Sequence, residues 1–486
     1  MEYIPSEQFL PATEALRQQT ARPAPKTPGA WGRFFKNKSS VSAGVLILAL
    51  LIFAILGPML LPYDVSTRDG YYKNVLPKWS PLAFLGWDGC ASRSCSQAAR
   101  DYYGAIGVEG GQPAVQAVKA SAIDPNTGAY RYELRIDTYA QVGFQYLDVM
   151  EADLAAIRAY EAESGLQVLY PLPRYYATTF LAVPGGANLW YRLSDESKYS
   201  SGLSKDHDSR GNAIYVADYL LDDAGQPVYA VKNQTGYRIR VLYSAYYRYQ
   251  TGHDPVHPFG TNQYGQDIFV CLAYGARLSF LLALGVSMLN FLIGMVYGAL
   301  EGYYGGKLDL IMERFSDILA AVPFIVVATL FQLHLAQRAG PVLSLLFAFV
   351  LTGWIGIASR VRTQFYRFKN AEYVLSARTL GASDGRLIFR HILPNSLGTI
   401  ITGTILMIPG VIFSESMLSY LGIVNLEAAR LTSIGTMLAG GRAYLGTFPH
   451  ILFFPAVFIA LLQISFNLFG NGLRDALNPA LRGVEA

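Results

Sequence analysis

The chain has 486 residues, of which 52% are hydrophobic and 15% are charged. Soluble proteins average about 25% charged residues, so this composition argues against a chain that is water-soluble throughout, and three cysteines exclude a small disulfide-built scaffold. The net charge of +4 is uneven, because residues 64–256 hold 18 Lys and Arg against 21 Asp and Glu, whereas the rest holds 21 against 14.

The first predicted element in chain order is a membrane span over residues 41–61, which follows a basic segment at residues 1–40. About 20 apolar residues are needed to cross a hydrocarbon core of roughly 30 Å. The run VSAGVLILALLIFAILGPMLL carries no charge, and Arg33, Lys36 and Lys38 precede it. A cleaved signal peptide is the alternative, but the leader and the apolar run are both too long for one.

Residues 64–256 form a polar block that is long enough for a folded domain. The pattern at residues 150–164 predicts a helix with two acidic residues in its first turn. Residues 213–233 predict two strands joined by an Asp-Ala-Gly turn, and residues 235–250 predict a further, aromatic-rich strand. We therefore expect a small α+β domain that is tethered to the membrane at both ends.

Two cysteines of this block, Cys90 and Cys95, stand close together in the sequence GCASRSC. In an oxidising compartment they would form a disulfide that closes a small loop. Two free thiols are the alternative, and the spacing alone leaves both interpretations open.

Five further stretches are long and apolar enough to cross, or nearly cross, a membrane. They are residues 278–300, 318–335, 341–359, 396–414 and 451–469. Lys and Arg concentrate in the segments that are cytoplasmic if the N-terminus is inside, and the short outer loops hold only Arg338, Arg430 and Arg442. We expect six helices, both termini in the cytoplasm with a tail at residues 471–486, and the polar block outside.

Motifs of several enzyme classes are missing from the sequence. It contains no HExxH or CxxC motif. The nearest approach to a phosphate-binding loop, EGYYGGKL at residues 301–308, has the wrong residue at its first and last positions. We therefore expect no catalytic, metal or cofactor site in this chain, so that any ATP would bind to another chain.

The basic stretch at residues 360–395 predicts a helix, a tight turn and a second short helix. The first helix is expected over residues 365–380, and Gly381 supplies the left-handed residue that ends it. Ser383 or Asp384 then caps a second helix, which is expected to run through Arg390 and to stop at Pro394. An ordinary basic cytoplasmic loop is the alternative.

The spacing of Ala377, Gly381 and Leu393-Pro394 resembles the EAA loop, the signature of permease subunits of ABC importers. The longer run ARTLGASDGRLIFRHILPN is similar to the dipeptide and oligopeptide subclass of these permeases, and to its second-permease type. Three more stretches agree, HPFGTNQYGQDIF from residue 257, YGARLSF with the segment up to residue 319, and PGVIFSESMLSYLGI from residue 409. Leu375 stands where the family has the Glu of EAA, and Glu372 lies three residues earlier.

The resemblance implies a type I ABC importer permease, with a core at residues 257–470, in the inner membrane of a bacterium. It implies import of di- or oligopeptides delivered by an extracytoplasmic binding protein. The implied partners are a second permease subunit and two ATPase subunits that hold ATP and Mg²⁺, with no nucleic acid. The residues that it assigns to ATPase coupling are Glu372, Ser376, Ala377, Gly381, Ala382, Ser383, Asp384, His391, Leu393 and Pro394.

Polar residues within the predicted spans are candidates for the translocation path, because unpaired polar groups in lipid are costly. These candidates are Glu415, Asn290, Gln332 and Asn467. For each residue, a hydrogen bond between neighbouring helices is the alternative.

Two other classes of protein remain alternatives to an importer. A channel or secondary transporter would need no loop that docks on an ATPase subunit, as residues 360–395 are expected to do. It should also show an internal repeat, which is not visible in this sequence. A membrane-anchored sensor would make the outer domain the working part and the helices its anchors. The resemblance covers little of residues 64–256, for which contact with a binding protein, a lid over the entrance and an insertion without a transport role all remain open.

Overall fold

The computed structural model describes residues 30–107, 109–123, 130–173, 186–188, 191–192, 216–217, 219–426 and 431–477. The chain divides into two compact units. The helical unit comprises Met1–Phe53, Ala276–Thr436 and Val457–Ala486, and the inserted unit comprises Ala54–Gly275 and Met437–Ala456. Most of the predicted N-terminal segment at residues 1–40, and the end of the predicted tail at residues 471–486, lie outside the described residues.

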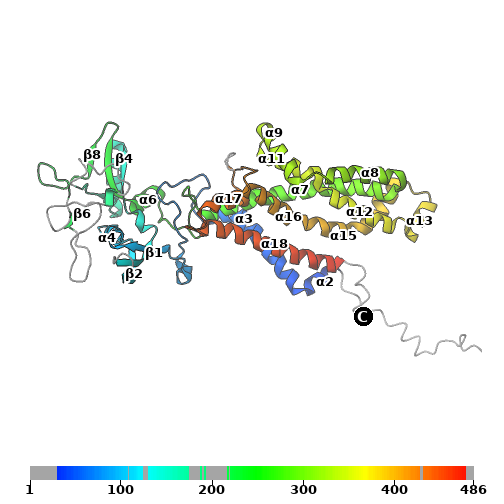
Figure 1. Cartoon of the computed structure of the whole chain (residues 1–486), viewed down its shortest axis with the longest axis horizontal. Coiled ribbons are helices and arrows are strands. Elements are labelled where there is room, and N and C mark those ends of the chain that lie inside the picture. The colour runs from blue at the N-terminus through cyan, green and yellow to red at the C-terminus, as the bar shows by residue number, and fades with distance from the viewer. Residues whose placement is uncertain are drawn as a thin grey trace, which may run out of the picture. The chain divides into compact units, whose positions relative to one another are not determined.

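Five helices in the described residues are long and apolar enough to cross a membrane (Figure 1). They are α3 (Lys38–Leu60), α7 (Ile268–Tyr304), α11 (Pro341–Gly353) continued by α12 (Ile355–Phe368), the run from α14 (Asp384–Arg386) to α16 (Met407–Tyr420), and α18 (His450–Leu477). Each overlaps one predicted span. The last four extend past it, because the helical backbone continues beyond the apolar stretch into polar sequence.

The predicted span at residues 318–335 is not a single helix. α8 (Gly306–Ala320) and α9 (Phe324–His334) meet at an angle of 71°. Pro323 occupies the N-cap position of α9, where the missing N–H and fixed φ of proline prevent α8 from continuing. A sixth span exists if this bent pair is counted as one. The short α10 (Ala336–Ala339) then leads to α11.

Three glycines on one face of α7 allow it to pack closely against α12 and its N-cap residue Trp354. Gly294, Gly298 and Gly302 are spaced by four residues, so they share that face. A β-carbon at Gly294 would lie 2.7 Å from the carbonyl oxygen of Trp354, and one at Gly298 would meet the carbonyl of Ala358. Such small residues let two membrane helices approach backbone to backbone.

The N-terminal helices are held against α18 within the helical unit. α2 (Ala30–Lys36) precedes α3, and the Phe34 ring meets the Phe469 ring edge-on with centroids 5.3 Å apart. The Arg33 guanidinium donates to the carbonyl oxygen of Ala476 at 2.7 Å. α2 therefore packs against the C-terminal half of α18.

The inserted unit contains antiparallel sheets, as the α+β expectation required. The first sheet has the order β1 (Cys90–Ser96), β3 (Tyr130–Asp137), β2 (Val115–Ile123), with α4 (Gln97–Ala105) following β1. In the second sheet, β9 (Tyr237–Leu242) pairs along one edge with β4 (Phe144–Val149). Its other edge pairs with β5 (Leu169–Tyr170) and with β8 (Ala230–Lys232). A third pair joins β6 (Tyr191–Arg192) to β7 (Val216–Ala217).

Two of the local predictions in this unit agree with the structure. The helix expected at residues 150–164 is α5 (Glu151–Ser164), which buries Leu154 and Ile157 against the second sheet. The turn expected between residues 213 and 233 is present, with Gly225 at a φ of +76°. Residues 213–215 and 218 lie outside the described residues.

The strand predicted over residues 235–250 is correct only in its first half. β9 ends at Leu242, and α6 (Tyr243–Thr251) follows at once. Tyr243 and Tyr247 are four residues apart, so a helix places both on the face that packs with Tyr72 and Tyr139. A separation of four residues places two side chains on one face of a strand as well, so this spacing alone does not distinguish the two structures.

The disulfide considered for Cys90 and Cys95 is absent, and both are free thiols. The two residues lie at opposite ends of β1, opposite Asp137 and Tyr132 on β3. Five residues of extended chain separate Cα atoms by about 16 Å, far more than the roughly 7 Å limit for a disulfide. An odd separation also directs the two side chains to opposite faces of the sheet.

Candidate functional site: the loop between α12 and α15 and the surrounding helices

The predicted docking loop folds into a helix, a tight turn and a second helix. α12 ends at Phe368, and α13 (Glu372–Thr379) begins after a three-residue break, so the single helix expected over residues 365–380 is divided. Gly381 has a φ of +81°, as its predicted role as a helix terminator requires. The N–H of Gly381 donates to the Arg378 carbonyl at 3.0 Å, and that of Ala382 donates to the Ala377 carbonyl at 3.1 Å. This pair of bonds is a Schellman motif, which fixes the direction of the chain after α13.

The second helix differs from its prediction at its end. Ser383 occupies the N-cap position but makes no side-chain capping bond. The helix then runs from α14 through a π-helical turn (Leu387–Ile392) into α15 (Leu393–Ile405), so it does not stop at Pro394. Pro394 lies in the first turn of α15, and the wider π-helical turn before it accommodates the absent N–H of proline. The loop is therefore continuous with a membrane helix.

Buried side chains hold this loop against the helical unit. Val374 and Leu387 are completely buried, and Ile388 is nearly so. They belong to one apolar cluster with Val361 and Phe365 of α12. Because residues from both halves of the loop enter the same cluster, both halves are packed against α12 through one shared core.

Hydrogen bonds add a polar connection between the loop and α7. The Tyr303 hydroxyl donates to the Asp384 carboxylate at 2.6 Å, and the Arg378 guanidinium lies 3.5 Å from the same hydroxyl. The Lys369 ammonium donates to the Gly302 carbonyl at 3.1 Å. The end of α7 is thus tied to both helices of the loop.

An ionic cluster beside this connection reaches α8. The Arg362 guanidinium donates to the Asp309 carboxylate at 2.6 and 2.8 Å and to the Glu313 carboxylate at 2.8 and 3.1 Å. The Tyr366 hydroxyl also donates to Asp309, at 2.6 Å. Sequence reasoning missed this cluster, because its members come from α8 and α12 and no local pattern relates them.

The ten residues predicted for coupling fall into three groups by exposure. Ala377, Ala382 and His391 are half-buried, and Leu393 is buried in the apolar cluster. The exposed members are Glu372, Ser376, Gly381, Ser383, Asp384 and Pro394. Leu380, which was not among those predicted, is 87% exposed at the tip of the turn. Leu375 and Phe389 are also exposed, but less so, at 43% and 54%. The loop therefore presents small and polar groups together with apolar side chains, of which Leu380 projects furthest.

Glu415, a predicted residue of the translocation path, is enclosed by this chain's own hydroxyl groups. It lies in α16 and is 1% exposed. Its carboxylate accepts hydrogen bonds from Ser433 at 2.7 Å, Ser419 at 3.1 Å, Ser279 at 3.2 Å and Ser416 at 3.5 Å. The carboxylate joins α7, α16 and the segment before α17 (Ile434–Gly441).

The other three path candidates are not brought together with Glu415. Asn290 is 1% exposed on α7 and packs against Gly353 of α11, and its Oδ1 has no hydrogen-bond partner among the described residues. The Gln332 side-chain amide donates to the Pro341 carbonyl at 2.9 Å, which links α9 to the start of α11. Asn467 is exposed on α18.

A cavity of about 460 Å³ in the helical unit is lined by residues that the sequence did not single out as a group. It lies among α12, α15 and α18, and its lining includes Arg360, Arg367 and Arg474. None of the four predicted path residues lines it. The convergence of these arginines depends on helices that are far apart along the chain.

Two protein families match this chain in separate segments. The family described as "Binding-protein-dependent transport system inner membrane component" matches residues 290–483. The family described as "N-terminal TM domain of oligopeptide transport permease C" matches residues 28–77. Residues 78–289, which include the sheets of the inserted unit, lie between the two matched segments.

Individual proteins agree with these matches. The chain is 44% identical over 226 residues to the oligopeptide transport system permease protein OppC of Bacillus subtilis (strain 168), covering 46% of this chain and 72% of that protein. It is 40% identical over 227 residues to the dipeptide transport system permease protein DppC of the same organism, covering 46% and 69%. A solved MetNI methionine ABC transporter in an inward-facing conformation matches 43% of this chain and 96% of its own, with 15% identity and a TM-score of 0.35. The match across more than two thirds of these permeases shows that the chain belongs to the family of binding-protein-dependent transport system inner membrane components, as a polytopic helical ABC importer permease with an inserted α+β domain.

Proposed function

We propose that this chain forms part of the translocation path of an ATP-driven importer of di- or oligopeptides. A binding protein would deliver the peptide outside the membrane, and residues 360–395 would dock on an ATPase subunit in the cytoplasm. The relatives named as oligopeptide and dipeptide permeases support the peptide cargo. The docking loop supports the mechanical role.

The geometry of the loop is the observation that carries this proposal. Buried Val374 and Leu387 join it rigidly to α12, and Leu380 projects from it with 87% of its side chain exposed. An exposed leucine beside small residues suits insertion into a groove on a partner protein. Force applied at the turn would pass through α15 directly into a membrane helix, because the helix is unbroken from Asp384 to Tyr420.

The proposed assembly contains two ATPase subunits, which bind ATP and Mg²⁺, and a second permease subunit. This chain would bind no cofactor of its own. Exposed Asn467 on the membrane helix α18 supports a neighbouring protein or an aqueous path at that face, since a polar side chain facing lipid is unfavourable. Glu415 is proposed to hold α7 and α16 together beside the path rather than to contact the peptide.

Thiol labelling of two exposed leucines tests the proposed orientation, with both termini cytoplasmic. Leu380→Cys lies in the docking loop and Leu221→Cys in the inserted unit, where Leu221 is 55% exposed. In a background with all three native cysteines replaced by serine, a membrane-impermeant maleimide should label Leu221→Cys in intact cells. It should label Leu380→Cys only after the cells are permeabilised. The reverse pattern would overturn the assignment of the loop to the cytoplasm.

Coupling is tested by a matched pair of glycine substitutions. Gly381→Ala places a β-carbon at a φ of +81°, whereas Gly385→Ala adds the same carbon, also in open space, without a positive φ. A strain of about 1 kcal/mol should reduce the docked population about fivefold. We expect Gly381→Ala to lower peptide uptake per ATP hydrolysed in proteoliposomes of the complete importer, and Gly385→Ala to leave it unchanged. Equal uptake in the two variants would remove the turn from the mechanism.

A further inference from the structure

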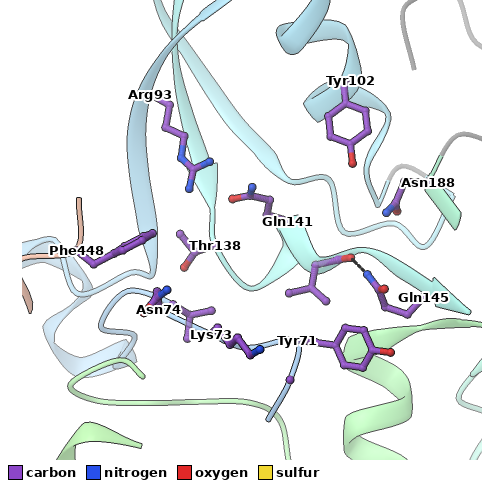
Figure 2. Close-up of a pocket in the computed structure, with 13 residues that line it drawn as sticks. Tyr71, Lys73, Asn74, Arg93, Tyr102, Thr138, Gln141, Gln145, Asn188 and Phe448 are labelled. Carbon is purple, nitrogen blue, oxygen red and sulfur yellow. Dashed lines mark hydrogen bonds between the residues drawn. The ribbon is translucent and has the colours of Figure 1, made fainter. Parts of the chain in front are cut away.

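A polar pocket lies within the inserted unit. Residues 70–75 of its lining belong to the segment matched by the N-terminal family, and most of the others lie between the two matched segments. Its volume is about 310 Å³, near the lower end of pockets that bind small molecules. The loop after α3 supplies Lys73 and Asn74, β1 supplies Arg93, and the turn between β3 and β4 supplies Gln141 (Figure 2). In this view the Arg93 guanidinium enters from above, and Lys73 and Asn74 enter from below.

The charge of the pocket is entirely positive. Lys73 and Arg93 are among its 13 lining residues, and no Asp or Glu is. One nitrogen of the Arg93 guanidinium donates to the Tyr103 hydroxyl at 3.2 Å, which leaves its other N–H groups for a ligand. Lys73 forms no ion pair with any residue that the structure describes. Two cations without a counter-ion favour an anionic ligand, and a guanidinium suits a carboxylate.

Amide side chains line the pocket beside these charges. The Oδ1 atom of Asn74 is buried and accepts no hydrogen bond from the described residues, which leaves an unsatisfied acceptor in a residue that lines the pocket. Asn74 also has a φ of +56°, a left-handed backbone conformation that is unfavourable for most residues with a side chain. The surrounding fold therefore holds the Asn74 backbone in a strained conformation. Burial raises the pKa of the Tyr102 phenol, so its hydroxyl stays protonated at neutral pH and can donate.

The frame of the pocket is fixed before any ligand binds. The Thr138 hydroxyl donates to the Gly89 carbonyl at 2.8 Å and accepts from the Leu76 N–H at 3.1 Å. The Asn188 side chain accepts from the Phe144 N–H at 2.8 Å. A preformed site loses little conformational entropy when a ligand enters.

We propose that this pocket binds the carboxyl-terminal end of a short peptide. Lys73 and Arg93 take the carboxylate, and Asn74 accepts the N–H of the adjacent peptide group. The choice of a peptide among carboxylates rests on the proposed import of peptides. The inserted unit then provides an additional binding site for the transported peptide on the permease itself.

Calorimetric titration of the full chain in lipid nanodiscs tests this site with defined probes. Dialanine should bind saturably, and dialanine amide, which lacks the carboxylate, should bind at least tenfold more weakly. Inorganic phosphate separates a peptide site from a general anion site and should also bind at least tenfold more weakly than dialanine. No saturable dialanine binding, equal affinity for the amide, or equal affinity for phosphate would each overturn the proposal.

Variants assign the binding to this pocket. Lys73→Ala should weaken dialanine binding at least tenfold, whereas Lys232→Ala, at an exposed lysine on β8 outside the pocket, should not. Asn74→Gly removes the amide but keeps a residue that adopts a positive φ easily, so it should weaken binding without lowering thermal stability. Unchanged binding in both pocket variants would contradict the assignment.

These measurements need neither ATP nor a partner chain, so they are independent of transport. Dialanine uptake by the complete importer is measured separately. Normal uptake together with a failed titration would overturn the pocket and leave the importer function intact. Saturable dialanine binding by a chain whose complete importer takes up no peptide would retain the pocket and overturn the importer function.

Discussion

Arg240 of the inserted unit and Glu415 of the helical unit are both buried charged residues, but their hydrogen-bond partners differ. In the inserted unit, Arg240 is completely buried, and its guanidinium donates to the carbonyls of Ala187 and Pro171 and, at 2.8 Å, to the carboxylate of Glu109. In the helical unit, Glu415 is equally buried, but its four hydrogen bonds come from serine hydroxyls.

This difference shows what each environment requires. Loops meet strands in the inserted unit, and a guanidinium with five donors can satisfy several loop carbonyls and a counter-ion at once. Helices satisfy their own backbone groups, so small side-chain donors from neighbouring segments are sufficient for the buried carboxylate of Glu415. Arg240 therefore organises irregular chain, whereas Glu415 connects elements that are already formed.

The largest effect is expected from breaking the buried pair in the inserted unit. Arg240→Leu removes the guanidinium from two backbone carbonyls and from the carboxylate of Glu109, which keeps a donor in the Tyr219 hydroxyl. The loss of the buried ion pair should cost about 3–5 kcal/mol. Protease cleavage of the inserted unit in the full chain, followed against urea concentration, measures the loss. Arg238→Leu, two residues away in a partly exposed pair with Asp148, is the matched control and should cost under about 1 kcal/mol. Equal losses would contradict the special role of burial.

In the helical unit, close backbone packing should matter more than the hydrogen bonds. Gly298→Ala forces α7 away from the Ala358 carbonyl and should destabilise the unit by about 1–3 kcal/mol. Gly285→Ala, on the same helix, meets nothing nearer than a Leu346 methyl at 3.8 Å and should be neutral or slightly stabilising. Thermal denaturation in detergent compares the two, and a stable Gly298→Ala variant would argue against the packing described.

Removal of the Glu415 carboxylate should have a smaller effect. Glu415→Ala leaves serine hydroxyls from α7 and α16 without their acceptor, at a cost of about 1–2 kcal/mol. Glu415→Gln retains an acceptor oxygen and should lose less. The same thermal measurement applies to both variants. A Gln variant that is less stable than the Ala variant would show that the surrounding serine hydroxyls do not stabilise the unit by donating to residue 415.

The smallest effect concerns the surface pair of Asp148 and Arg238. The Arg238 side chain lowers the pKa of the Asp148 carboxyl by hydrogen bonding, so the pair stabilises the fold above the ordinary carboxyl pKa. That stabilisation is lost as the pH falls through the lowered pKa. Asp148→Asn should cost under about 1 kcal/mol at pH 7, and its stability should converge with the parent chain in acid. A difference that persists at low pH would assign the effect to packing.

Local signals in the sequence predicted the elements that depend only on near neighbours. Charge-free runs indicated the membrane helices, because the length of an apolar segment decides whether it can span lipid. Gly381 indicated the end of α13, because a left-handed residue after a helix favours glycine. The motif around this turn also indicated the family, to which the matched relatives assign the chain.

Other features were decided only by the tertiary structure. Arg240 pairs with Glu109, 131 residues away, and Glu415 accepts from Ser279, 136 residues away, as well as from nearer serines. No periodicity relates positions as far apart as these two pairs. The change from strand to helix at Tyr243 depends on packing against Tyr72, and the continuation of the helix through Pro394 depends on a π-helical turn anchored in the apolar cluster. Sequence patterns report chain propensity over a few residues, whereas these outcomes follow from which distant surfaces meet when the chain folds.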